Sequence, residues 1–348
     1  TSGSVASGTI VSGGGTMAVS GIISGTTLLS GGEATISSGA SSYSATISSG
    51  AVFSILSGGT TSSTILSAGG TLNIGNTFRA IHNDNQTASS GAVINVLSGG
   101  VLSAGDVASN GRINVSSGGS TADTIVSGGG TLNISDGGAV DSATIISGGT
   151  LSAANGALLS GQITVSAGGT ELSGSLASAA VMAVQGTASA TTILSGAIAT
   201  VTSGGTIAEV TISNGGVVTA YSAGSIKSAT IGSGGTLNYL SGASGSLNDL
   251  QAGGTFNLGA GFNTNHGTHL SAVSGAVINV LSGGALGDGD VASGGTITVN
   301  SGGGAFDVIV SGGGTVAVSG VISRTTLLSG GAVTALSGGT VASSNISS

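Results

Sequence analysis

Cysteine, proline and tryptophan are absent from the 348-residue sequence, and charged and aromatic residues supply only 5% and 2% of it. A chain without cysteine has no disulfide framework, which is compatible with secretion because disulfides are common outside the cell without being required. Without proline, and with no glycine at every third position, the sequence is not a collagen. The shortage of large side chains excludes an ordinary globular core, so the buried residues must be mainly small and aliphatic.

Basic residues are scarce as well. Four of them (Arg79, Arg112, Lys227 and Arg324) stand against 12 acidic residues, which gives a formal net charge of -8. Nucleic-acid binding depends on lysine and arginine contacts with phosphate, so the composition argues against a nucleic-acid partner. No apolar run approaches the roughly 18 residues of a membrane-spanning helix, and we expect no membrane insertion of this segment. Thr1 begins inside the repeat pattern without a preceding signal segment, so we expect the chain to be part of a longer protein.

Glycine is abundant, with 70 residues, and its spacing is regular. Glycine-rich sequence often forms flexible linkers, but here 39% of the residues are hydrophobic, so there is apolar surface to bury. Three consecutive segments, starting at Thr192, Thr211 and Thr230, repeat a Thr-Ile pair, a small-residue corner and a second apolar run. A fixed period of this length, about 19 residues, indicates a stacked array of coils.

Each coil contains short runs of alternating apolar and polar residues bounded by Ser-Gly-Gly, which is typical of β-strands. Glycine supplies the positive-φ corners. Equivalent strands of successive coils pair in parallel about 4.8 Å apart, and such connections are right-handed. We therefore predict an all-β fold, a right-handed parallel β-helix (solenoid) of short coils, continuous as a single domain over residues 1–348. Two ladders should face its interior: Ile193/Ile212/Ile231 and Ala199/Val218/Leu237.

A larger repeat lies over the short one. Residues 89–119 recur at 273–303, an offset of 184 positions. Two segments interrupt the short repeat at the same place in each copy, 76–89 and 260–273, and we predict that both are loop inserts. A third irregular segment, 172–191, lacks the Ser-Gly-Gly corners.

The two inserts concentrate residue types that are rare elsewhere, including all three histidines. Loops on a rigid scaffold are a usual place for recognition, so we predict that these inserts project and bind a ligand. The alternative is that their two phenylalanines fold back and cover strand edges. The candidate binding residues are Phe78, Arg79, His82, Asp84, Phe262, His266 and His269.

Units such as TIVSGGGTLNISDGGAVDSA (124–143) and TLLSGGEATISSGASSYSA (27–45) resemble the repeats of AIDA-type autotransporter passenger domains, which belong to self-associating adhesins of Gram-negative bacteria. The resemblance covers nearly all of the chain outside the inserts, although the chain is poorer in Asn, Asp and Lys. It implies a secreted β-helix at the cell surface with a role in adhesion, aggregation or biofilm formation. Some of these adhesins carry heptose on repeat serines, which implies a glycosyltransferase partner and the sites Ser30, Ser127, Ser147, Ser203 and Ser329.

Other chemistry has little support in the sequence. The Gly-Asp-Gly-Asp tract at 287–290 resembles part of a calcium-binding nonapeptide, but it occurs once and Leu286 replaces a required glycine, so we favour a structural turn. The histidines lack the cysteines or nearby acids of a zinc site. We predict no metal and no cofactor.

Long parallel β-helices often host polysaccharide lyases or hydrolases, so an enzyme is one alternative. Such sites need paired carboxylates, whereas Glu33, Glu171 and Glu209 are isolated in the sequence. An ice-binding face would need regular Thr-Xaa-Thr, which occurs only at 200–202 and 296–298. We predict a non-enzymatic, extracellular adhesive passenger that binds itself on neighbouring cells, or host glycans or proteins. The alternatives are a spacer or subunit of a surface fibre or surface layer and, less favoured, a polysaccharide-degrading enzyme.

Overall fold

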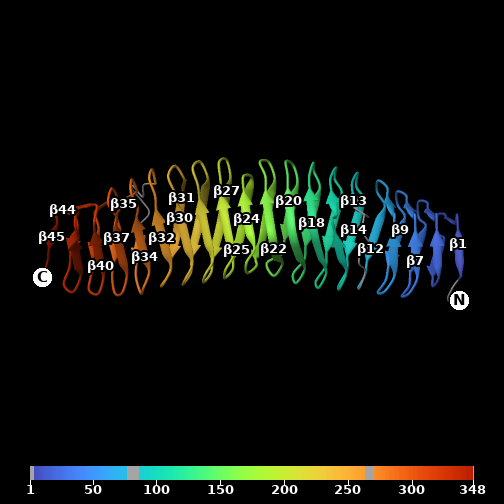
Figure 1. Ribbon diagram of the computed structural model, residues 1–348, viewed down its shortest axis with the longest axis horizontal. Coiled ribbons are helices and arrows are strands. Elements are labelled where there is room, and N and C mark those ends of the chain that lie inside the picture. Colours follow the sequence, from blue (N-terminus) through green and yellow to red (C-terminus); the bar gives the residue numbers. More distant parts are fainter. Residues whose placement is uncertain (1–3, 77–85, 263–269, 348) are drawn as a thin grey trace. The chain divides into compact units, whose positions relative to one another are not determined.

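The computed structural model of the chain describes residues 4–76, 86–262 and 270–347, in which every regular element is a β-strand. The chain divides into two compact units, Thr1–Ser175 (unit 1) and Leu176–Ser348 (unit 2). Within each unit, equivalent strands of successive coils lie side by side (Figure 1) and pair in parallel. Both units are therefore β-solenoids, as predicted. The described residues contain no candidate membrane-spanning helix. The continuity of the solenoid over residues 1–348 remains a prediction.

One coil of unit 1 shows the plan of all of them. β5 (Thr27–Leu28) lies in a first sheet, β6 (Glu33–Ile36) in a second and β7 (Ser41–Tyr43) in a third. A first turn joins the first and second sheets, a second turn joins the second and third sheets, and a bend at a single residue returns the chain to the first sheet. In several coils the third-sheet and first-sheet segments form one strand that runs across the bend.

The strands of unit 1 follow this plan. The remaining first-sheet strands are β2 (Ile10–Val11), β8 (Thr46–Ile47), β11 (Ile65–Leu66), β13 (Thr87–Ala88) and β16 (Asp106–Val107). The second-sheet strands are β3 (Thr16–Val19), β9 (Val52–Ile55), β12 (Thr71–Ile74), β14 (Val93–Val96), β17 (Arg112–Val115), β19 (Thr131–Ile134) and β21 (Thr150–Ala153). The third-sheet strands are β1 (Val5–Ser7), β4 (Ile22–Ser24), β10 (Thr60–Ser62) and β15 (Val101–Ser103), and the combined ones are β18 (Ser120–Val126), β20 (Ala139–Ile145) and β22 (Leu158–Val165). β23 (Thr170–Leu176) contains the division between the units.

Unit 2 is built in the same way. Its second-sheet strands are β24 (Val181–Val184), β26 (Ile198–Val201), β28 (Val217–Ala220), β30 (Thr236–Tyr239), β32 (Thr255–Leu258), β34 (Val277–Val280), β37 (Thr296–Val299), β40 (Thr315–Val318) and β43 (Ala332–Ala335). Its combined strands are β25 (Thr187–Ile193), β27 (Thr206–Ile212), β29 (Ser225–Ile231) and β31 (Ser244–Leu250). Its third-sheet strands are β35 (Ala285–Gly287), β38 (Gly304–Phe306), β41 (Val321–Ser323) and β44 (Thr340–Ala342), and its first-sheet strands are β33 (Leu270–Ala272), β36 (Gly289–Val291), β39 (Ile309–Val310), β42 (Thr326–Leu327) and β45 (Asn345–Ile346).

The interior is made of aliphatic ladders, and the second sheet shows why. Its strands alternate half-buried and fully buried residues, because successive side chains of a strand point to opposite faces. Isoleucines 193, 212 and 231 pair in register and are completely buried. The ladder Ala199, Val218 and Leu237 is also buried and in register. Both predicted interior ladders are confirmed.

The two glycines of a Gly-Gly corner have different structural roles. Gly215 has φ of +75°, which a side chain disfavours. Gly216 has no such φ, but a Cβ on it would lie 2.7 Å from the carbonyl oxygen of Ile193 in the preceding coil. The first glycine is thus required by its conformation and the second by the close approach of successive coils. Sequence reasoning identified only the first of these reasons.

The third corner lacks the glycine signal of the other two, because glycine is uncommon there. The bend residues include Ser44, Asp123, Glu209 and Arg324, all with φ between 50° and 55°. Single non-glycine residues can adopt this left-handed conformation at a cost of roughly 1–2 kcal/mol. The bend therefore presents polar and charged side chains on the outside of the coil.

The structure also corrects two predicted segment boundaries. The insert at 76–89 ends in β13, which pairs with β16, and the insert at 260–273 ends in β33, which pairs with β36. These strand residues belong to the regular coils. The segment 172–191 is also more regular than expected, since β24 and β25 pair in register with β26 and β27. Ala179, with φ of +64°, stands at the turn position that glycine occupies elsewhere.

An aromatic cluster fills the interior of unit 2 at one point. The ring of Tyr239 stacks on Phe262 with centroids 4.2 Å apart, and Phe256 meets both rings edge-on. The Tyr239 hydroxyl donates a hydrogen bond of 2.9 Å to the carbonyl oxygen of Ile226. Burial raises the pKa of Tyr239 above its ordinary value, because an ionised phenol would be desolvated.

This pKa shift predicts an alkaline loss of stability. Below the ordinary tyrosine pKa of about 10, Tyr239 is neutral in both states and its contribution is intact. Above that pH the unfolded state releases the proton while the folded state keeps it, so the free energy of unfolding falls by up to about 1.4 kcal/mol per pH unit. Tyr239→Phe removes the hydrogen bond and should lower the free energy of unfolding by about 1 kcal/mol at neutral pH. Above pH 10, the free energy of unfolding of this variant should fall less steeply with pH than that of the native chain. Denaturant titrations across that range would measure this, with the exposed Tyr221→Phe as the control. An unchanged slope in Tyr239→Phe would contradict the assignment.

Candidate interaction surfaces

The second sheet of unit 1 carries a continuous row of amide side chains on its outer face. Asn95 donates from Nδ2 to Oδ1 of Asn73 over 2.8 Å, and Asn114 and Asn133 continue the row with bonds of 2.9 Å. Asn73 in turn donates to the Ser54 hydroxyl over 2.9 Å. We call these five residues, Ser54, Asn73, Asn95, Asn114 and Asn133, the first asparagine row.

Unit 2 repeats this arrangement. Asn238 donates to the Thr219 hydroxyl over 3.0 Å, Asn257 donates to Asn238, and Asn279 donates to Asn257 over 2.7 Å. Thr219, Asn238, Asn257 and Asn279 form the second asparagine row. An amide has two N–H donors and two acceptor lone pairs, and one ladder bond in each direction leaves further capacity on every rung. Each half-buried row is therefore able to bond with a surface laid against it.

The serines predicted as modification sites lie at the corners. Ser30, Ser147, Ser203 and Ser329 are exposed at the first position of a turn, each directly before a glycine with positive φ. Ser127 is half-buried and lies one position earlier in its turn, because two positive-φ glycines, Gly128 and Gly129, follow it. Four of the five serines are thus exposed residues, and modification of all five remains a prediction.

Most of the predicted loop residues fall outside the described part of the chain. These are Phe78, Arg79, His82, Asp84, His266 and His269. Phe262 is described, and only 7% of it is exposed. It packs into the aromatic cluster with Tyr239, so it lines the interior rather than a projecting loop. The tract Gly287–Asp290 belongs to β35, β36 and the bend between them, in agreement with a structural turn. Among the described residues, no group of three or more His, Cys, Asp or Glu side chains is arranged to hold a metal ion.

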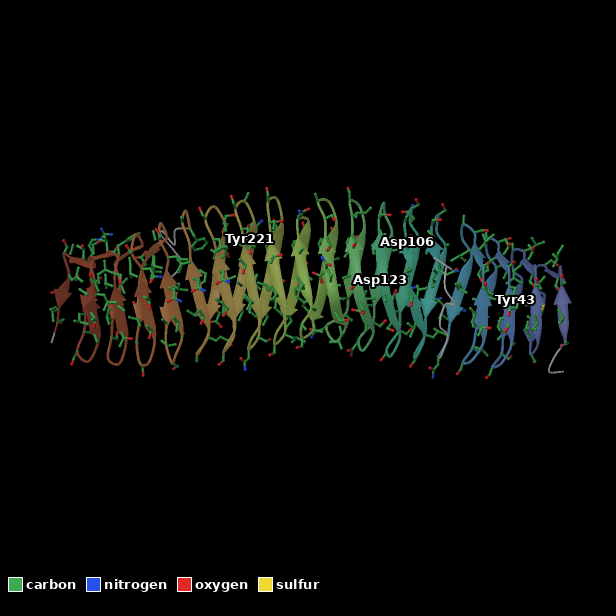
Figure 2. The ribbon with its side chains drawn as sticks, in the orientation of Figure 1. Tyr43, Asp106, Asp123 and Tyr221 are labelled. Carbon is green, nitrogen blue, oxygen red and sulfur yellow. The ribbon has the colours of Figure 1, made fainter. Side chains whose placement is uncertain are left out.

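The bends of unit 1 border a groove that the sequence did not predict. Its volume is about 340 Å³, and three successive coils line it. Figure 2 labels Asp123, which lines the groove, and Asp106 on a neighbouring coil. We call this the bend groove; its lining residues are Asp123, Thr124, Ile125, Ser142, Ala143, Thr144, Gln162 and Thr164. No local motif signals it, because its residues come from separate repeats and include only one charged side chain.

The bends of unit 2 carry an ion pair instead. Arg324 donates from Nε and Nη2 to the two carboxylate oxygens of Asp307, with both distances 2.7 Å. The guanidinium carbon also lies 5.6 Å from the centre of the Phe306 ring. The bond to Asp307 is the main cause that raises the pKa of Arg324, with the charges of Asp307 and Asp288 adding to it. An arginine at the bend is thus held in a fixed, two-pronged geometry.

Comparison with known proteins identifies no family for the chain. No protein-family model matches the sequence, and no curated protein matches it. Among solved structures the chain is similar to one described as the crystal structure of the TibC-catalyzed hyper-glycosylated TibA55-350 fragment, with 22% identity, 99% of this chain and 97% of that chain covered, and a TM-score of 0.31. A likeness this distant assigns neither a family nor a function to the chain.

Proposed function

We propose that the chain is an extracellular adhesive protein that associates with further copies of itself through the outer face of its second sheet. The observation that carries this proposal is the pair of asparagine rows. Each row repeats one hydrogen-bonding group per coil on a regular β-scaffold, so two such faces can match over many rungs. Single contacts between amides and hydroxyls are weak, but many of them in a fixed array act together once the first is formed. Little conformational freedom is lost, because the ladder bonds already order the side chains.

The composition of the surface supports the same proposal. With 5% charged residues, two facing second sheets meet little charge repulsion and bury few ions. The resemblance of the repeats to autotransporter passenger domains agrees with display on the surface of a Gram-negative bacterium. A spacer or subunit of a surface fibre is the alternative, and it would use the ends of the coils rather than their faces.

Charge placed beside the first asparagine row tests the proposal. Arg112 already lies in the outer row adjacent to the asparagines, between Val93 and Thr131 in register, so a long cation is tolerated there. We expect beads coated densely with the native chain to clump, with weak salt dependence. The double variant Val93→Lys with Thr131→Lys should abolish clumping, because like charges on the two facing surfaces repel each other. The control carries the same two charges on the first sheet, as Thr27→Lys with Thr46→Lys.

Three results would count against this assignment. Clumping by the second-sheet variant at the native level would remove the asparagine face from the mechanism. Equal loss of clumping in the control would mean that added charge acts nonspecifically. Release of reducing ends from polysaccharides by the purified chain would favour the enzymatic alternative.

A further inference from the structure

The two units place an aspartate at the same bend in equivalent coils. The offset of 184 residues continues beyond the longest matching segment, so that STADTIV at 120–126 corresponds to GAFDVIV at 304–310. Asp123 and Asp307 therefore occupy equivalent positions. Both have the left-handed bend conformation, with φ of 50° and 56°. The outward isoleucine two residues later, Ile125 or Ile309, is also shared and exposed in both.

The two aspartates differ in what stands on the next coil. In unit 2 that bend residue is Arg324, whose guanidinium binds both oxygens of Asp307. In unit 1 the register pairs Ala122 with Asp141 and Thr124 with Ala143, so the residue beside Asp123 is Ser142. Serine is too short to fill the space that an arginine would take. The bend groove opens at this point.

The next coil widens the groove and adds polar groups. The register between β20 and β22 shifts by one residue, so that two residues of β22, Gly161 and Gln162, stand opposite Ser142. Gln162 thereby becomes part of the groove wall. The hydroxyls of Ser142, Thr144 and Thr164 line the same space. All of these side chains can accept a hydrogen bond from a donor-rich ligand, while Ile125 offers an apolar surface to an aliphatic chain.

We propose that the bend groove binds the guanidinium group of an arginine from a partner protein. Asp123 would hold it as Asp307 holds Arg324, since the planar fork of a guanidinium matches the two oxygens of a carboxylate. Its methylene stem would lie along Ile125, as long cationic side chains do on apolar surface. No lysine or arginine lines the groove, and Asp106 and Asp141 on adjacent coils add negative charge. This site is separate from the second-sheet face and does not depend on self-association.

Binding of a short peptide to the full chain tests the proposal. The probe is a terminally blocked peptide with one arginine among glycines and serines, and the matched probe has citrulline in its place, which keeps the shape and removes the charge. We expect the arginine peptide to bind about tenfold or more tightly than the citrulline peptide, as measured by chemical-shift titration, and to weaken as salt is added. A lysine peptide should bind between the two, because an ammonium lacks the planar fork.

Two substitutions place the binding in the groove. Asp123→Asn should reduce the affinity for arginine to that for citrulline. Ser142→Arg should do the same by supplying an internal guanidinium, as Arg324 does in unit 2, while the thermal midpoint stays at or above the native one. Asp136→Asn, an acid in the second turn of the same unit, is the control and should bind normally.

The proposal is overturned if the two peptides bind alike, if neither binds at millimolar concentration, or if Asp123→Asn binds arginine as the native chain does. Beads coated with Asp123→Asn should clump as beads coated with the native chain do. Failure of the arginine-binding proposal would therefore leave the second-sheet proposal intact, and failure of the second-sheet proposal would leave the arginine-binding proposal intact.

Discussion

Ile212→Asp should lower the free energy of unfolding by roughly 4 kcal/mol or more. Ile212 is fully buried and pairs in register with Ile193 on one side and Ile231 on the other, so the carboxylate would be enclosed by isoleucine ladders without a partner. A loss of this size corresponds to a fall of about 10 °C in the thermal midpoint, measurable by circular dichroism.

The neighbouring residue supplies the control. Thr211 is exposed on the same strand, and Asp249 lies two coils further along in the same outward row. Thr211→Asp should therefore change the thermal midpoint by only a degree or two. If Ile212→Asp melts at the native temperature, the inward face of β27 has been assigned wrongly.

Gly215→Val should destabilise unit 2 by about 3 kcal/mol. The glycine has φ of +75°, a conformation in which a β-branched residue is strongly disfavoured. Its N–H bonds to the carbonyl oxygen of Gly234 on the next coil, 2.9 Å away, and an added Cβ would lie 3.0 Å from the Ser195 hydroxyl oxygen. The turn cannot relax without giving up that bond between coils.

Asparagine at the same position separates conformation from size. Asn110 occupies the equivalent turn position in unit 1 with φ of +63°, so Gly215→Asn should cost less than about 1 kcal/mol. Urea titrations of the two variants would measure the difference. Equal losses for valine and asparagine would show that crowding, rather than the left-handed conformation, makes glycine necessary there.

The fold could be predicted because its determinants are repeated. The regular spacing of Ile193, Ile212 and Ile231 predicts a row of inward-facing side chains. The glycines predict the positions of two of the three corners. The residues that form the third corner were not identified, since Ser44, Asp123 and Arg324 share a conformation but no residue type. A backbone conformation that several residue types can adopt is not signalled by any one residue type in the sequence.

The candidate surfaces were predicted less well than the fold. The repeat predicts outward ladders of Ser, Thr and Asn side chains. It does not predict that Asn95, Asn114 and Asn133 bond to one another from coil to coil. The direction of the Phe262 ring could not be deduced, because a turn residue points inward or outward according to a local geometry that the repeat does not fix. The bend groove depends on three coils and one register shift, none of which is visible in any single repeat.

The register has a consequence for how such a sequence can change. Ladder partners are separated by 19 residues between Asn114 and Asn133, by 22 between Asn73 and Asn95, and by 17 between Asp307 and Arg324. The segments that connect equivalent strands thus differ in length by several residues, while each strand contacts only the coils next to it. Insertion or deletion of a whole coil would leave the surroundings of every distant residue unchanged, whereas one residue added inside a strand would turn its inward side chains outward. Length within a unit is therefore adjustable in steps of one coil, and recombination between repeats is the mutation that this architecture tolerates most readily.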